Sequence, residues 1–314
     1  MSDGPSLAAC ASNNLPAVSP LKRGAAALLR STGVTFLSRA LQRAALTPFI
    51  RVLYYHDVPE AMGRAFADQL SALKQAFVPA SRADLERLLT AGHWPHERPG
   101  IIVTFDDGLR SHSEVVAPIL EQLGYEGWFF IPIDLVTSAA EEHPVLASRH
   151  GVLHGCDTAR DPRIFMTEQQ LVELSRRHNV GCHTASHVRL SDDLSDAQLE
   201  LQIVNAKQRL EAVLGRGVNS FSWVGGEEWA YSPAAASCIA RHFEYAFTTN
   251  TRVTRPGTSR LLIDRTHVEA SFPPALVSLQ VSGLMDLYYR PKRKRIAARF
   301  ALPSARICAN VVSD

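Results

Sequence analysis

Short, nearly continuous apolar runs alternate with amphipathic helical segments along the middle of the chain. The runs 101–105 and 128–131 are typical of strands that are buried on both faces of a parallel sheet. Helical segments separate the runs, and one of them, 195–214, begins with a capping box of Ser195 and Gln198. About seven such β/α units over roughly 230 residues favour a closed barrel over an open sheet. We therefore predict an α/β barrel, in which chemistry is placed at the C-terminal ends of the strands.

The same reading assigns the other elements of the barrel. The expected further strands are 51–55, 180–182, 218–224, 245–249 and 261–268, and the expected further helices are 83–91, 113–123, 167–178, 233–242 and 274–285. Residues 136–165 contain Gly, Pro, His and charged residues without a clear period. We expect them to form a long loop that shapes substrate choice.

Charge divides the chain into an acidic body and two basic ends, although the net charge is only +2. Residues 1–49 carry five basic residues and one acidic residue, and residues 286–314 carry seven basic and two acidic. An acidic body argues against nucleic-acid binding. We expect a basic N-terminal extension at 1–49, a barrel at 50–285 and a basic C-terminal tail at 286–314. The extension is either an amphipathic helix on a membrane or a helix packed on the barrel, and the tail is either solvated or in contact with anionic lipid.

Cysteine usage and targeting signals bear on the compartment. The five cysteines form no CxxC pair and are odd in number, which disfavours a disulfide framework and a four-cysteine zinc site. The first 20 residues lack the pattern of a signal peptide, and Arg30, Arg39 and Arg43 interrupt the apolar stretch 25–50. We expect a cytoplasmic protein, with peripheral contact with the inner membrane face as an open alternative.

Two polar motifs follow predicted strands. Asp106 and Asp107 end the strand 101–105, where adjacent buried carboxylates are costly unless they are paired or bind a cation. His183 and His187 follow the strand 180–182 at a spacing that can place both imidazoles on one metal ion. One carboxylate with two imidazoles would suit one divalent ion. Zn²⁺ is favoured, and Co²⁺, Ni²⁺ or Mn²⁺ are also acceptable.

These motifs carry a family resemblance. Thr104-Phe-Asp-Asp-Gly108 and His183-Thr-Ala-Ser-His187 resemble the first two motifs of the polysaccharide deacetylases, the NodB-homology carbohydrate esterases of family 4. The surroundings are similar too, from Tyr54-Tyr-His-Asp-Val58 onward, and the resemblance runs from about residue 50 to 285. It implies a distorted (β/α)7 barrel of the TIM-like type. It also implies metal-dependent removal of N- or O-acetyl groups from sugars, here with an N-acetylated glycan as the substrate.

The resemblance also implies roles for individual residues. Asp107, His183 and His187 would hold the metal, and Asp106 would be the general base that activates the attacking water. The family takes the proton for the leaving amine from a late histidine, for which His267 is the candidate here. His56 ends the first strand and could line the pocket.

The third motif departs from the family pattern. In place of Arg-Pro-Pro-Tyr-Gly the chain reads Phe221-Ser-Trp-Val-Gly-Gly226, so the arginine that would orient the base is missing. Gly225 or Gly226 could still supply a backbone N–H donor, and Trp223 could stack on a sugar or belong to the core. The leading hypothesis is a deacetylase acting on an N-acetylhexosamine in a polysaccharide, an oligosaccharide or a lipid-linked precursor of exopolysaccharide. The alternatives are a catalytically silent barrel that binds a glycan or a partner, and a deacylase for another acyl group.

Overall fold

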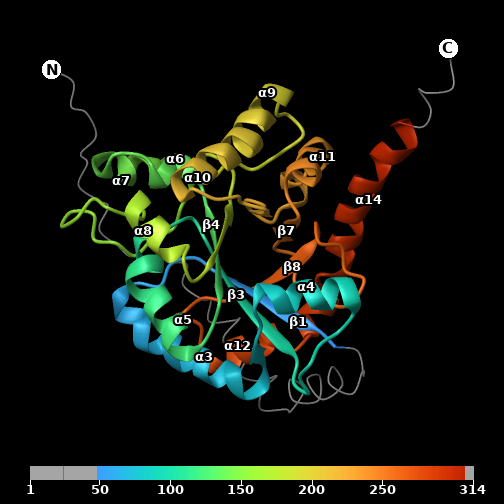
Figure 1. The fold of residues 1–314 in the computed structure, drawn as a ribbon, viewed down its shortest axis with the longest axis horizontal. Helices are drawn as coiled ribbons and strands as arrows, with labels where there is room; N and C mark the ends of the chain where they lie inside the picture. Colours follow the sequence, from blue (N-terminus) through green and yellow to red (C-terminus); the bar gives the residue numbers. More distant parts are fainter. Residues whose placement is uncertain (1–23, 25–47, 308–314) are drawn as a thin grey trace.

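A computed structural model of the chain describes residue 24 and residues 48–307, with side chains up to 300. Seven parallel strands close into a barrel (Figure 1). In chain order the strands are β1 (Ile50–Tyr55), β3 (Gly100–Asp106), β4 (Gly127–Ile131), β5 (Asn179–Cys182), β6 (Ser220–Ser222), β7 (Tyr245–Thr248) and β8 (Ile263–His267). Each strand pairs with the next, and β1 pairs with both β8 and β3, which closes the ring. A short strand, β2 (Val78–Pro79), adds to the start of β3 outside the ring. The predicted distorted (β/α)7 barrel is thereby confirmed.

Alternate residues along the strands divide between two apolar clusters. Val52, Ile102 and Phe130 belong to one cluster, and Leu53 and Val103 belong to the other. Because side chains alternate across a strand, one cluster fills the barrel and the other packs against the helices around it. Strands buried on both sides explain why the sequence reads as continuous apolar runs here rather than as alternation.

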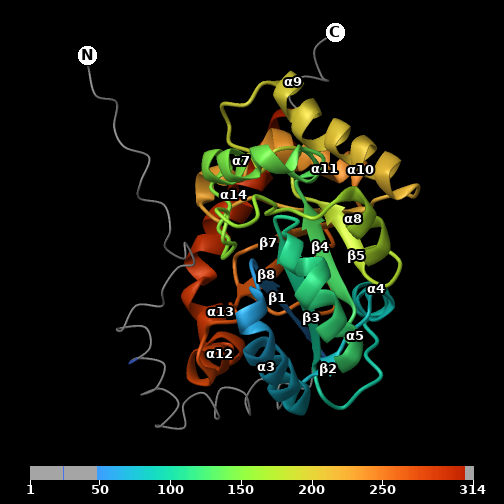
Figure 2. The ribbon, with the colours of Figure 1, turned by 90° about the vertical axis from the view of Figure 1, so that its left-hand side faces the viewer.

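Helices surround the barrel (Figures 1 and 2). They are α3 (Gly63–Ala76), α4 (Arg82–Ala91), α5 (Ala117–Leu123), α6 (Ile133–Val136), α7 (His143–His150), α8 (Glu168–Leu174), α9 (Asp196–Leu199), α10 (Ala206–Leu214), α11 (Pro233–His242), α12 (Pro274–Val281), α13 (Leu284–Tyr288) and α14 (Arg290–Ile307). The helical turns His112–Val116 and Glu200–Asn205 lead directly into α5 and α10. The capping boxes at Thr167/Gln170 and Ser195/Gln198 are both formed.

Two parts of the chain differ from expectation. The segment 136–165 is not a plain loop, because it contains a short helical turn at Ala140–Glu142 and the helix α7. Helix α7 buries only His143 and Ala147, so its sequence has too narrow an apolar stripe to show a helical period. Helix α3 was not predicted at all, although its buried face is Phe66, Leu70 and Leu73.

The basic segment after residue 285 forms helix up to Ile307 rather than an irregular tail. Helix α14 lies beside α11, and Ile296 is buried against the apolar cluster outside the barrel (Figure 1). The predicted N-terminal extension lies outside the described residues, apart from Gly24, Pro48 and Phe49. Within the described range, no helix has the length and apolar character that crossing a membrane requires.

Candidate active site

The two adjacent carboxylates lie where β3 ends. Asp106 is the last residue of the strand, and Asp107 adopts a left-handed backbone with a φ of 82°. Gly108 continues the turn with a φ of 64°. A non-glycine residue in this region is uncommon and costs free energy, so the surrounding structure must hold Asp107 in place. Both side chains are buried, which places two carboxylates beneath one mouth of the barrel.

The two histidines come from the turn after β5. His187 and the intervening Thr184 also have positive φ values, 57° and 60°. The Nδ1 of His183 lies 2.8 Å from the carbonyl oxygen of Ser222, and the Nδ1 of His187 lies 2.8 Å from the carbonyl oxygen of His150. Because a carbonyl only accepts, each Nδ1 must carry a hydrogen and donate it. In the neutral form of each ring, Nε2 then keeps its lone pair.

These two Nε2 atoms converge on one oxygen of Asp107. The Oδ1 of Asp107 lies 3.1 Å from His187 Nε2 and 3.6 Å from His183 Nε2. This buried oxygen accepts no well-aligned hydrogen bond from the described residues. Such an orphaned oxygen is costly without a partner, so the donor set fits a divalent cation. One carboxylate and two imidazoles are the ligands that Zn²⁺ and its neighbours in the first transition series accept.

The three residues of the ligand set differ in how the site shifts their pKa values. Burial lowers the pKa of His183 to about 4, so its ring is neutral near pH 7. Burial acts the same way on His187, but the Asp107 carboxylate outweighs it and raises the pKa of His187 above its usual value. Burial opposes ionisation of Asp107, yet His187 holds the pKa of Asp107 well below its ordinary range. Asp107 is therefore a carboxylate, which is the form that binds metals.

Asp106 is held by a residue that the sequence does not predict. Arg265, a fully buried residue of β8, donates from both terminal nitrogens to the two oxygens of Asp106, at 2.7 and 2.8 Å. The same guanidinium donates to Thr104 Oγ1 and to the Thr248 carbonyl, and it lies over the ring of Tyr54. Although burial alone would raise the pKa of Asp106, Arg265 lowers it below its usual value. An arginine thus contacts Asp106, and it comes from β8 rather than from the third motif.

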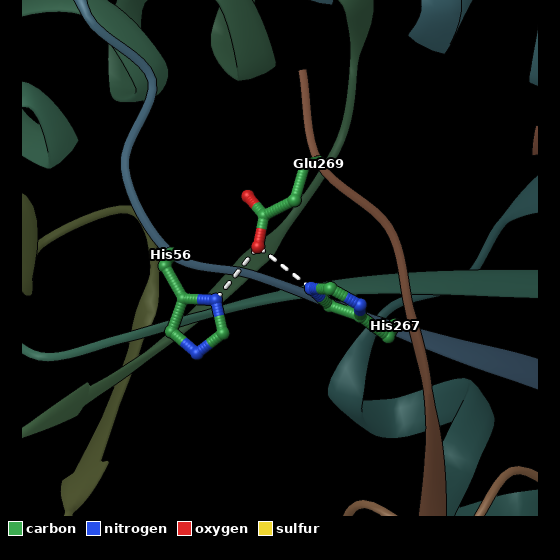
Figure 3. A group of neighbouring side chains, drawn as sticks. All are labelled: His56, His267 and Glu269. Carbon is green, nitrogen blue, oxygen red and sulfur yellow. Dashed lines mark hydrogen bonds and ion pairs between the residues drawn. The ribbon is translucent and has the colours of Figure 1, made fainter. Parts of the chain in front are cut away.

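A second cluster lies beside the first. One carboxylate oxygen of Glu269 lies between two imidazoles, 2.8 Å from His56 Nδ1 and 2.7 Å from His267 Nε2 (Figure 3). Burial alone would lower the pKa of His56, but the charge of Glu269 and its hydrogen bond raise it to about 9. The pKa of Glu269 falls to about 2, because the two histidines outweigh its burial. His56 is therefore protonated at neutral pH.

The third motif contributes only part of what the sequence suggests. Gly225 and Gly226 line the site, but the N–H of Gly226 donates to the side chain of Glu227, 3.0 Å away. Trp223 is 2% exposed and packs against Phe221 and Tyr231. Of the two alternatives for Trp223, this burial favours packing in the core over stacking on a sugar. A further aromatic neighbour, Phe300 of α14, comes from a distant segment, and the residue order alone could not show that contact.

One cavity of about 430 Å³ joins these groups. Its walls include Asp106, Asp107, His183, His187 and His56, together with Gly151 and Leu153 from the segment 136–165. The expected proton donor His267 is not among the lining residues, whereas His56 is. The cavity also receives Tyr289 and Lys292 from the C-terminal helical segment.

Sequence reasoning therefore missed four groups at this site. They are Arg265, Glu269, Lys292 and the His150 carbonyl. Arg265 and Glu269 flank the predicted His267 on β8 and just after it, so a closer reading of that strand end could have found them. The His150 carbonyl has no side-chain signal, because any residue supplies it.

Comparison with known proteins agrees with this geometry. Residues 94–242 match the sequence model of the polysaccharide deacetylase family. No curated protein matches the chain. Among solved structures, the deacetylase PplD of Streptococcus pyogenes, in complex with acetate, matches with a TM-score of 0.58 and 18% identity, over 74% of this chain and 98% of that one.

Two further structures show the same fold. IcaB from Ammonifex degensii matches with a TM-score of 0.56 and 23% identity, over 76% of this chain and 97% of that one. The deacetylase domain of BpsB from Bordetella bronchiseptica has a TM-score of 0.54 and 18% identity, over 70% of this chain and 96% of that one. The matched segment carries both the Asp pair and the His pair. Residues 94–242, which hold both motifs, therefore match the polysaccharide deacetylase family, and the barrel that contains them has the fold of these solved structures.

Proposed function

We propose that the protein is a divalent-metal-dependent deacetylase that removes the acetyl group from an N-acetylhexosamine in a polysaccharide, an oligosaccharide or a lipid-linked glycan precursor. The observation that carries the proposal is the convergence of His183 Nε2 and His187 Nε2 on Oδ1 of Asp107, a buried oxygen that accepts no well-aligned hydrogen bond from the described residues. Asp106 lies beside this set, 4.0 Å from His183, and is held away from metal ligation by Arg265.

The proposed reaction is hydrolysis of an amide. A divalent ion held by Asp107, His183 and His187 would polarise the acetyl carbonyl and stabilise negative charge on its oxygen. Water attacks the acetyl carbon, and Asp106 accepts a proton from that water. Because Arg265 occupies both oxygens of Asp106, the carboxylate is fixed in position and ionised before substrate arrives.

The leaving amine needs a proton when the C–N bond breaks. We assign the donor role to His56, because its protonated ring lines the cavity that contains Asp106 and Asp107. His267 does not line the cavity and contacts Glu269 instead, so we assign it a positioning role. Water supplies the second oxygen of the acetate, and the amine leaves with the proton from His56. Exchange with solvent then removes the proton from Asp106 and returns one to His56.

Arg265 bears on the alternative of a silent barrel. The sequence favours that alternative only through the missing arginine of the third motif, and Arg265 supplies an arginine partner to the proposed base. We therefore propose an active enzyme.

The test is acetate release from N-acetylglucosamine oligomers and lipid-linked precursors by the metal-loaded protein. We expect release by the wild type and a loss of about two to four orders of magnitude in Asp106→Asn, because the general base is removed. His183→Ala should release no acetate because it loses the metal, and elemental analysis measures that loss independently. Release that is unchanged in both variants would contradict the proposal.

A further inference from the structure

Lys292 reaches the cavity from outside the barrel. It belongs to α14, and with Tyr289 it lines the cavity. Its ammonium lies 5.6 Å from the ring centre of Tyr289. A Cβ added at Gly226 would lie 3.7 Å from Lys292 Nζ, which places the ammonium beside the third motif.

The start of α14 is firmly anchored, so this position is fixed. Arg293, the next residue, donates to the carbonyl oxygens of Asn250, Thr251 and Asp286, at 2.9, 2.5 and 2.6 Å. One turn further, Ile296 is buried at 3% exposure. Lys292 is thus held at the cavity by contacts that its own side chain does not make.

The other cations on this side already have carboxylate partners. Arg189 pairs with Glu227, and Arg295 pairs with Glu228. Within the described part of the chain, no carboxylate lies within ion-pair distance of Lys292 Nζ. Lys292 is half-buried, and burial lowers its pKa, which shows that its charge lacks full solvation. An unpaired and partly buried ammonium costs free energy that an anionic ligand would offset.

We propose that Lys292 forms an anion-binding subsite, and that the preferred substrate carries a carboxylate or phosphate next to the acetamido sugar. This inference rests on the proposed deacetylase function and adds its substrate class. A uronic acid neighbour and a sugar phosphate share the required chemistry, a compact anion that a primary ammonium can contact. Three carboxylates, Glu227, Glu228 and Asp264, act on Lys292 from beyond ion-pair distance. Each of them is already paired with an arginine, so Lys292 has no carboxylate of its own.

Matched substrate pairs test the inference. N-acetylglucosamine 1-phosphate is compared with methyl N-acetylglucosaminide, and a hyaluronan tetrasaccharide is compared with chitotetraose. The readout is the ratio of kcat/KM for acetate release within each pair. We expect the wild type to prefer at least one anionic member by about tenfold, the effect of one partly exposed charge contact. The pair that shows the preference identifies the anion as phosphate or carboxylate.

Variants of two lysines on α14 show whether Lys292 causes the preference for the anionic substrate. Lys292→Gln should bring the ratio close to one, and Lys292→Arg should retain part of it. Lys294→Gln, an exposed lysine on the same helix that does not line the cavity, should keep the wild-type ratio. Binding of the same four compounds to metal-loaded Asp106→Asn, with and without Lys292→Gln, gives the ratio of dissociation constants within each pair when no turnover occurs.

The outcomes separate the two proposals. Acetate release with no anionic preference, or equal loss in Lys292→Gln and Lys294→Gln, overturns the subsite and leaves the deacetylase standing. Anion-selective binding that requires Lys292, without acetate release from any compound, supports the subsite and contradicts the proposed reaction. If the protein shows no anion-selective binding and releases no acetate, both proposals are contradicted.

Discussion

Arg265 and Asp106 form a buried ion pair with two hydrogen bonds across the barrel, from β8 to β3. Both side chains are almost inaccessible to solvent, at 0% and 4% exposure. A fork of two parallel bonds fixes the plane of the carboxylate as well as its charge. The pair therefore sets both the ionisation and the direction of the proposed base.

Replacing Arg265 separates these two contributions. Arg265→Met leaves an unpaired buried carboxylate and should lower the free energy of unfolding by about 3–5 kcal/mol. Arg265→Lys keeps a positive charge but loses the fork, so kcat should fall by about tenfold or more while much of the stability remains. Urea unfolding and steady-state acetate release measure the two effects.

Arg51 provides the matched control for this experiment. It forms a second buried pair, with Asp286 at 2.7 and 3.2 Å, and does not line the cavity. Arg51→Met should destabilise the protein with little change in kcat at a temperature where it stays folded. An equal fall of kcat in both methionine variants would mean that Arg265 acts only through stability.

The pH profile tests the proton donor. Because Glu269 raises the pKa of His56 to about 9, the ring is charged below that pH and loses its proton above it. We expect kcat/KM to decline on the alkaline side near pH 9. Glu269→Gln removes the charge that raises this pKa, so the alkaline limb should move to lower pH.

His56→Gln and His267→Gln distinguish donor from positioning residue. His56→Gln should remove the alkaline limb together with most of the activity. His267→Gln should keep the limb but shift it, because His267 acts only through Glu269. A limb that survives unchanged in His56→Gln would assign the proton donor elsewhere.

The stability of the protein should follow the same titration. A raised pKa in the folded state stabilises the fold fully below the unfolded value near 6.5, and this contribution disappears as pH rises through about 9. The free energy of unfolding should therefore fall more steeply between pH 7 and 9.5 in the wild type than in His56→Gln. Chemical unfolding at a series of pH values measures the difference.

Asp107 is the predicted carboxylate ligand, and Asp57 is a matched buried carboxylate nearby. Asp57 accepts hydrogen bonds from Ser111 Oγ and from the Gly155 N–H, at 2.5 and 2.6 Å. Asp107→Asn should lose zinc on dialysis, because a neutral amide is a weaker ligand. Asp57→Asn should keep one equivalent, as elemental analysis would show. Equal zinc content in the two variants would contradict the ligand assignment.

Substitutions of Trp223 and Trp229 should have different effects on the stability of the protein. Trp223 is 2% exposed, and Trp223→Ala should cost about 3–5 kcal/mol of stability through the cavity that it leaves. Trp229 is 52% exposed, so Trp229→Ala should change stability by no more than about 0.5 kcal/mol. Trp223→Phe should leave KM unchanged. A large rise in KM for that variant would restore a substrate role for Trp223.

The sequence predicts the strands of this barrel well, and the reason is physical. A strand buried on both faces must be apolar throughout, so Ile101 to Phe105 is visible without any partner. The Asp pair and the His pair are likewise local, because each occupies one strand end. What the sequence misses depends on contacts between distant segments. Arg265 lies at a strand end that the sequence marks, but its pairing with Asp106 spans 159 positions, so the sequence does not show which group it contacts.

The segment 136–165 shows a second kind of limit. It was expected to be a loop, yet α7 within it delivers the His150 carbonyl to His187. A backbone acceptor can come from any residue, so its place in the site depends on the fold alone. Lys292 is similar, since a charge run reads as a solvated tail until the helix is seen beside the cavity.

The most direct test of the account is acetate release by the zinc-loaded wild type beside Asp106→Asn, with zinc content measured on the same samples. The account predicts that both proteins bind one equivalent of zinc, because Asp106 is not a ligand, and that only the wild type releases acetate at a substantial rate. Equal release by both proteins, or loss of zinc from Asp106→Asn, would contradict the division of the two carboxylates into base and ligand.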